Sequence, residues 1–369
     1  MIKKGILILI PAFFLLYEGS AQMPSALSVI EDTIASGLKR YGVPSVSVAV
    51  MKNGAIVWAK AYGMADKTSG RSADTNTLYQ VASMSKSVNA FCVMRLVQDQ
   101  RLSLDTDIRS LLHSWKFPDN EFSKNIPITL RNLLSHTAGL GVHGFKGYLH
   151  TEKIPSIDAM LDGQPPSNSG KIEAIIKPGT KVEYSGGGTL IIKKILQDNI
   201  ASNYDSLLEV MVLRPLGMMH STFKQPLDKK YTNFAAAYDE FGKEVPGKYY
   251  IYPEQSPDGL WTTASDYARF VISIQRSLAG NPTALLNRQA ATLMLTPVLD
   301  SAALGFFITG KEGQTYFGHS GGNIGFRCAY NGSFTGGTGV VVLTNSDRGG
   351  YLVGDIIKCV AAVYQWKGF

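Results

Sequence analysis

Strand-like segments at both ends of the chain, with a helix-rich middle, limit most strongly how this sequence can fold. Near the N-terminus, two apolar runs at 45–51 and 55–62 flank Asn53-Gly54, and an Asn-Gly pair in that setting is a strong β-hairpin signal. Past residue 303, strand-like runs return at 304–309, 315–318, 325–331 and 339–344. Apolar residues at helical spacing predict helices at 25–40, at 83–99 with others up to about 295, and at 352–366.

The economical arrangement is an α/β (α+β) fold in which the first hairpin and the last strands form one antiparallel sheet. The terminal helices would cover this sheet, and the helical middle would form a second lobe. We therefore predict a single domain over 22–369, with a sheet lobe built from 22–82 and 300–369 and a mostly helical lobe over 83–299. The segment 141–175 is rich in Gly, Pro and Ser and is predicted to be a long loop.

The N-terminal segment has the features of a secretory signal peptide. Lys3 and Lys4 precede a short apolar run, and small residues follow at Gly19 and Ala21. We predict a signal peptide over residues 1–21, a periplasmic or secreted protein, and no stable membrane anchor. The alternative is that the segment stays uncleaved as an N-terminal anchor.

Composition excludes some classes of partner and cofactor. The net charge is +7, but the basic residues are scattered among acids and form no run, so we expect no nucleic-acid partner. The cysteines Cys92, Cys328 and Cys359 have no neighbours at metal-ligand spacing. The sequence predicts neither a metal nor an organic cofactor.

The stretch Gly318-His319-Ser320-Gly321-Gly322 fits G-x-S-x-G, the nucleophile elbow of α/β-hydrolases. In that fold the catalytic histidine follows the serine along the chain, and no histidine follows Ser320. The residues after Ser320 are also glycine-broken and strand-like, whereas an elbow leads into a helix. Ser320 is therefore a poor candidate for the nucleophile.

A second serine has a better chemical setting. Ser83 and Lys86 form S-x-x-K, which places both side chains on one face of a helix that begins near Ser83. Burial would lower the pKa of Lys86 and provide a neutral amine as a base, and the helix N-terminus would favour a developing oxyanion. The tetrad alone is weak, because it also occurs at Ser36…Lys39 and Ser221…Lys224.

The motifs that follow Ser83 along the chain distinguish it from the other two tetrads. It is followed in order by Tyr184-Ser185-Gly186 and His319-Ser320-Gly321. This set resembles the motifs S-x-x-K, Y-x-N and K/H-x-G of the serine β-lactamase and penicillin-binding fold, in the class C β-lactamase-like branch. That branch includes D-alanyl-D-alanine carboxypeptidases, D-aminopeptidases and esterases. The framework segments 128–140, 215–218, 262–266 and 318–322 also look familial, so the resemblance covers nearly the whole chain after the signal peptide.

The resemblance implies a role for each motif residue. Ser83 would attack a carbonyl and carry an acyl group, and Lys86 and Tyr184 would share the proton transfers; which of the two is the general base is left open. The backbone N–H groups of Ser83 and Gly322 would form the oxyanion hole. His319 would donate a hydrogen bond to Tyr184 or to a substrate carboxylate. The remaining residues expected to line the substrate strand are Ser320 and Gly321.

One departure from the family pattern bears on the substrate. Gly186 stands where the family has Asn, so a side-chain contact to the substrate amide is missing. We therefore expect a serine hydrolase of D-amino-acid peptides or small esters, with peptidoglycan fragments as a candidate substrate. The alternatives are a class C β-lactamase and a non-catalytic protein that binds cell-wall fragments or β-lactams.

Overall fold

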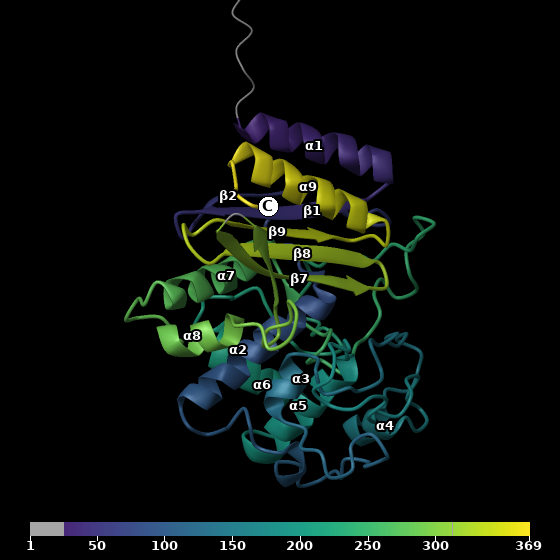
Figure 1. Ribbon diagram of the computed structural model, residues 1–369. Coiled ribbons are helices and arrows are strands. Elements are labelled where there is room, and N and C mark those ends of the chain that lie inside the picture. The colour runs from purple at the N-terminus through teal and green to yellow at the C-terminus, as the bar shows by residue number, and fades with distance from the viewer. Residues whose placement is uncertain (1–25, 312) are drawn as a thin grey trace, which may run out of the picture.

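The computed structural model describes residues 26–311 and 313–369 (Figure 1). The signal peptide predicted over residues 1–21 lies outside this part of the chain. Within it, no helix is both long and apolar enough to cross a bilayer.

The centre of the sheet lobe is a seven-stranded sheet with the order β3-β2-β1-β9-β8-β7-β6, in which all neighbours are antiparallel. The first hairpin thus pairs with the last strand, and the predicted fold class is confirmed. The strands of this sheet are β1 (Ser45–Lys52), β2 (Ala55–Asp66), β3 (Arg71–Ser72), β6 (Phe307–Lys311), β7 (Gln314–Asn323), β8 (Phe326–Ser333) and β9 (Gly339–Thr344). Strand β7 is longer than the predicted 315–318 and includes the whole GHSGG stretch.

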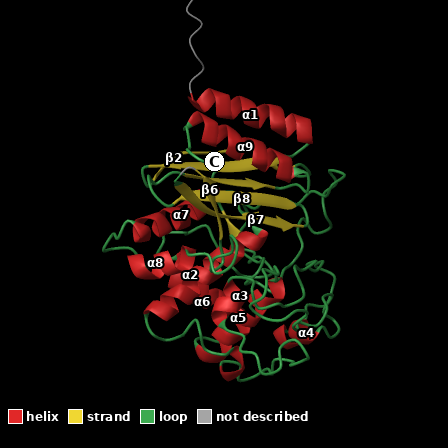
Figure 2. Cartoon of the chain, in the orientation of Figure 1, coloured by secondary structure: helices red, strands yellow, loops and turns green. Residues whose placement is uncertain are grey.

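Two helices cover one face of the sheet, and the helical lobe lies on the other side (Figures 1 and 2). The covering helices are α1 (Ala26–Tyr41) and α9 (Gly349–Val363), close to their predicted positions. The other helices and helical turns are η1 (Ala82–Met84), α2 (Ser85–Gln98), η2 (Ile108–Ser110), α3 (Leu130–Leu134), α4 (Ile157–Asp162), α5 (Gly186–Asn199), α6 (Tyr204–Leu208), η3 (Glu209–Leu213), α7 (Ala264–Leu278) and α8 (Arg288–Leu295).

The prediction of a loop over 141–175 misses one element, because this segment contains α4. The Ser156 side chain caps this helix by accepting from the backbone N–H of Ala159, and Gly163 ends it in the left-handed conformation. With six residues the helix is too short for its apolar periodicity to stand out among glycines and prolines.

Alternating side chains of the central strands build two separate cores. On β1, Val46, Val48 and Val50 pack toward α1 and α9, whereas Ala49 and Met51 pack toward the helical lobe. This is the period of two expected for a strand with both faces buried. Because one core lies on each face, the sheet is fixed between the terminal helices and the helical lobe.

A short second sheet joins two segments that are far apart in the sequence. Strand β4 (Tyr79–Gln80) pairs with β5 (Trp261–Thr262), which places the residues just after β4 beside those just before β5. Helix α2 begins immediately beyond this point and runs through the middle of the helical lobe, with nearly all of its side chains buried.

Candidate active site

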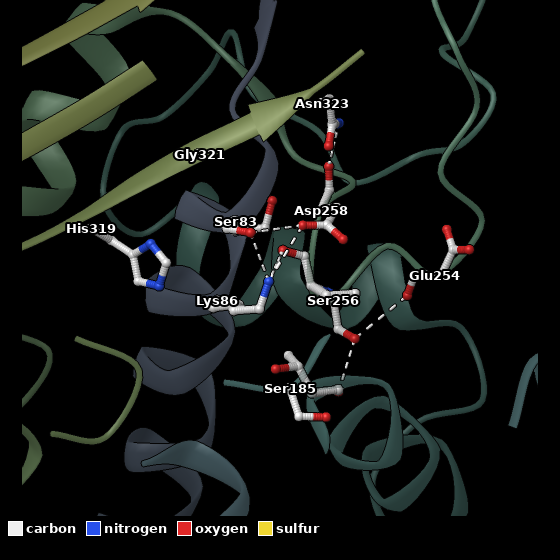
Figure 3. Close-up of polar contacts among 12 residues, drawn as sticks. Ser83, Lys86, Ser185, Glu254, Ser256, Asp258, His319, Gly321 and Asn323 are labelled. Carbon is white, nitrogen blue, oxygen red and sulfur yellow. Dashed lines mark hydrogen bonds and ion pairs between the residues drawn. The ribbon is translucent and has the colours of Figure 1, made fainter. Parts of the chain in front are cut away.

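Ser83 lies in the turn that leads into α2. The turn η1 spans Ala82–Met84, and Ala82 has a φ of 45°, a left-handed conformation that is costly for a residue with a Cβ. Ser83 itself is half-buried, and the Nζ atom of Lys86 lies 2.9 Å from its Oγ atom (Figure 3). The geometry that S-x-x-K predicts at these two residues is present.

The other two S-x-x-K tetrads do not pair their serine with their lysine. The hydroxyl of Ser36 donates to the carbonyl of Thr33 on the exposed side of α1. Ser221 donates to the Asp266 carboxylate, while Lys224 pairs with Asp228. The structure thus distinguishes Ser83 from both.

Sequence reasoning missed the second partner of the Ser83 hydroxyl, which is Asp258. The Oγ atom of Ser83 lies 3.0 Å from Oδ1 of Asp258, and the Nζ atom of Lys86 lies 3.4 Å from the same oxygen. Both charged side chains are buried, with 2% of Lys86 and 6% of Asp258 exposed. In Figure 3 the three side chains converge on one point.

Backbone contacts fix the Asp258 loop against the Ser83 turn. The N–H of Val81 donates to the Leu260 carbonyl, and the N–H of Leu260 donates to the hydroxyl of Ser85. On the other side, the amide of Asn323 at the end of β7 donates to the Asp258 carbonyl. The carboxylate is therefore positioned by connections to three separate segments.

The charge state of Lys86 differs from the expectation. Burial disfavours the ammonium, but the nearby Asp258 and Tyr184 outweigh it, and the pKa of Lys86 is raised above its ordinary value. The prediction that burial lowers this pKa and leaves a neutral amine is therefore wrong. It considered desolvation without the carboxylate that lies beside the amine.

Tyr184 lies next to Lys86, just before α5. The Nζ atom of Lys86 is 5.1 Å from the centre of the Tyr184 ring, and interactions with Tyr184 contribute to the raised pKa of Lys86. The ring packs between two histidines, with its centre 4.3 Å from that of His136 and 6.0 Å from that of His319. Ser83, Lys86 and Tyr184 thus lie together, with His319 beside the tyrosine ring.

His319 has a different hydrogen-bonding state from the one expected. Its Nδ1 atom lies 2.6 Å from the Ser320 carbonyl, which can only accept, so Nδ1 carries the proton. Burial and the charge of Lys86 lower the pKa of His319 to about 4, so the ring is neutral and Nε2 is an acceptor. The expectation that His319 donates to Tyr184 or to a carboxylate does not fit this state; Nε2 is buried without a partner among the described residues.

Strand β7 passes directly over the turn before Ser83. A Cβ atom on Gly321 would lie 2.3 Å from the Val81 carbonyl oxygen, so only glycine permits this approach. Ser320 and Gly322 point the other way and are exposed. The roles expected for Ser320 in lining the substrate strand and for the Gly322 backbone N–H in the oxyanion hole stay predictions.

Gly186 begins α5, and the space beside it is already occupied. A Cβ atom on Gly186 would lie 3.1 Å from the His143 carbonyl oxygen and 3.1 Å from the Phe145 ring. Ser185 caps the helix by accepting from the N–H of Gly188. A side chain at position 186 would therefore press against the half-buried Phe145 ring.

The neutral state of His319 predicts a loss of stability in acid. The unfolded histidine titrates near 6.5 and the folded one near 4, so between these values the unfolded state binds more protons and stability falls as pH falls. From pH 6.5 to pH 5 the loss is about 2 kcal/mol in the free energy of unfolding. His319→Gln should reduce this slope in urea unfolding at several pH values; an equal slope in the wild type and the variant would contradict the assignment.

Comparison with known proteins finds a family model that matches most of the chain. The family model described as Beta-lactamase matches residues 30–357. "Protein flp" of Staphylococcus aureus (strain MW2) is 28% identical over 244 residues, and the match covers 64% of this chain but 45% of that protein. The chain thus spans less than half the length of this relative.

Two solved structures show the same fold. The D-alanine carboxypeptidase AmpC from Burkholderia cenocepacia superposes with a TM-score of 0.73 at 17% identity, covering 91% of this chain and 98% of that one. The D-amino acid amidase from Ochrobactrum anthropi SV3 superposes with a TM-score of 0.72 at 20% identity, covering 92% and 97%. With a family model matched across most of its length, this chain belongs to the Beta-lactamase family.

Proposed function

We propose that this protein is a serine hydrolase that cleaves D-amino-acid peptides or small esters through an acyl-enzyme on Ser83. The observation that carries the proposal is the position of Ser83, whose Oγ atom lies between the Lys86 amine at 2.9 Å and the Asp258 carboxylate at 3.0 Å. A hydroxyl with a cation on one side and a proton acceptor on the other is set up for nucleophilic attack.

The proposed reaction has two stages. In the first, the Ser83 oxygen forms a bond to the substrate carbonyl, the backbone N–H groups of Ser83 and Gly322 stabilise the oxyanion, and the leaving group departs with a proton. Tyr184, whose ring centre lies 5.1 Å from the Lys86 amine, would assist that proton transfer. In the second, water attacks the acyl group and releases the acid together with free Ser83.

The surroundings of Ser83 favour an apolar substrate group over a β-lactam. The Phe145 ring lies beside Gly186. The Phe307 ring stacks on the Tyr184 ring, with 6.3 Å between the two ring centres. Without an amide side chain at position 186, the site lacks one contact to a substrate amide. The fold relatives named for D-alanine carboxypeptidase and D-amino acid amidase activities support D-configured substrates, with peptidoglycan fragments as one natural source.

A small substrate panel tests the proposal. Purified protein is assayed with p-nitrophenyl butyrate, with D-alanine and L-alanine p-nitroanilides, and with benzylpenicillin, and its intact mass is recorded after each incubation. We expect turnover of the ester or the D-amide, a preference for D over L, and at most a slowly released penicillin adduct. Rapid penicillin hydrolysis would support a β-lactamase instead, and no turnover with no adduct would support a non-catalytic binding protein.

A further inference from the structure

The hydrogen bonds around Ser83 have a definite direction. Besides Ser83, the Nζ atom of Lys86 contacts the Pro257 carbonyl at 3.0 Å and the Asp258 carboxylate at 3.4 Å, and both of these can only accept. An ammonium has three protons and no lone pair, so it also donates to the Oγ atom of Ser83. The Ser83 proton then has one place to go, which is Oδ1 of Asp258 at 3.0 Å.

We propose that Asp258 is a catalytic residue, the general base that takes the proton of Ser83 during acylation. This inference rests on the proposed hydrolase function. As the Ser83 oxygen bonds to the substrate carbonyl carbon, its O–H bond breaks and the proton forms a carboxylic acid on Asp258. That proton returns to the leaving group when the tetrahedral intermediate collapses, so Asp258 ends the stage as a carboxylate. Lys86 stays an ammonium throughout and stabilises the charge on the Ser83 oxygen.

The raised pKa of Lys86 supports this division of roles. A base must be deprotonated at working pH, and a buried ammonium that a carboxylate stabilises loses its proton only at high pH. For an aspartate the deprotonated form is the charged carboxylate, which is the form that the neighbouring ammonium stabilises. The pair therefore places the available base on Asp258 rather than on Lys86.

Other titratable groups surround Asp258 without taking its place. Tyr252 and Glu254 on the same loop interact with its charge; burial raises the pKa of Glu254 to about 8. Across the site lie Tyr184, His136 and His319. His136 accepts from the N–H of Ser185 through Nδ1, and His319 donates through its own Nδ1. Among the described residues, the side-chain hydrogen-bond partners of the Ser83 hydroxyl are Lys86 and Asp258.

The variant Asp258→Asn tests the proposal while keeping the shape of the side chain. We expect kcat/KM for the best substrate of the panel to fall by about 10³-fold, within the range of general-base contributions. We also expect the pH dependence to change. Wild-type kcat/KM should rise with pH through the acidic range, before amines lose protons. In the variant burial of Lys86 is no longer opposed by this carboxylate, so Lys86 can act as a weaker base and the rise should move to higher pH.

A role limited to positioning predicts something different, namely a lower rate at every pH with the rise at its wild-type position. That result, or an unchanged kcat/KM, would overturn the proposal. The matched control is Asp66→Asn, because Asp66 is a buried aspartate paired with Lys248 at 2.5 Å outside the site. This control should keep the wild-type rate and pH profile. Asp258→Glu, which restores a carboxylate, should recover part of the activity and the acidic rise.

The wild type gives a second test that does not depend on the folding of a variant. The rate of labelling by a fluorophosphonate reports how readily Ser83 loses its proton, and we expect that rate to reach its plateau below about pH 8. Labelling that rises only where lysine amines titrate would make Lys86 the base and overturn the proposal. If the wild type neither hydrolyses the panel nor takes the label, the hydrolase function itself fails, which separates the two outcomes.

Discussion

Ser83→Ala is expected to lower kcat/KM by about 10⁴-fold or more on every substrate that the wild type accepts, because no acyl-enzyme can form without the hydroxyl. The fold should persist, since Ser83 is half-buried and its loss leaves Lys86 donating to Pro257 and Asp258. Steady-state kinetics measure the loss, and intact mass after fluorophosphonate treatment shows whether the label is absent.

The matched control is Ser36→Ala, which removes the serine of another S-x-x-K tetrad on the exposed side of α1. It should leave both kinetics and labelling at wild-type levels. Full hydrolysis by the Ser83→Ala protein would mean that another group is the nucleophile, and Ser320 in GHSGG would then be the first to replace.

Much of the fold was predictable because its signals are local. The Asn53-Gly54 turn between two apolar runs specifies a hairpin whatever the rest of the chain does. The apolar run at 45–51 indicates a strand, and the order of strands and helices leaves few ways to close one sheet. The helix α4 was missed because a six-residue helix gives too little periodicity to detect.

The motif residues of the candidate site were predictable for a different reason. Ser83 and Lys86 are three residues apart, so helical geometry alone joins them, and the resemblance added Tyr184 and His319. Asp258 had no such signal. It lies in Ser-Pro-Asp-Gly, which reads as an ordinary turn, and its contact with Ser83 spans 175 residues of sequence. The pairing of β4 with β5 and the contacts beside it bring the two segments together.

That missing contact also explains the wrong charge state for Lys86. A buried lysine considered alone favours the neutral amine, and the sign changes once a carboxylate lies within 3.4 Å. For His319, the position on a strand was predicted from the sequence. Its protonation was not, because the proton on Nδ1 depends on a carbonyl contact that only the structure shows. Charge states depend on long-range neighbours, whereas strand and helix positions largely do not.

Removing the cation tests the same network through stability. Lys86→Met is expected to lower the free energy of unfolding by about 3–5 kcal/mol, because it leaves the Asp258 carboxylate buried and without its charge partner. It should also lower kcat/KM by about 10³-fold, since the Ser83 oxygen loses the charge that stabilises it. Urea unfolding at pH 7 with an unchanged m-value measures the first effect, and the panel substrates measure the second.

A double-mutant cycle with Asp258→Asn separates the pair from its parts. When both charges are removed, no unpaired ion remains, so the double variant should be more stable than the sum of the two single losses allows. Lys248→Met, which breaks the Asp66 pair outside the site, should lower stability without lowering kcat/KM. Additive losses in the cycle would mean that Lys86 and Asp258 do not interact as a buried ion pair. The charge assignment on which the direction of proton transfer depends would then fail as well.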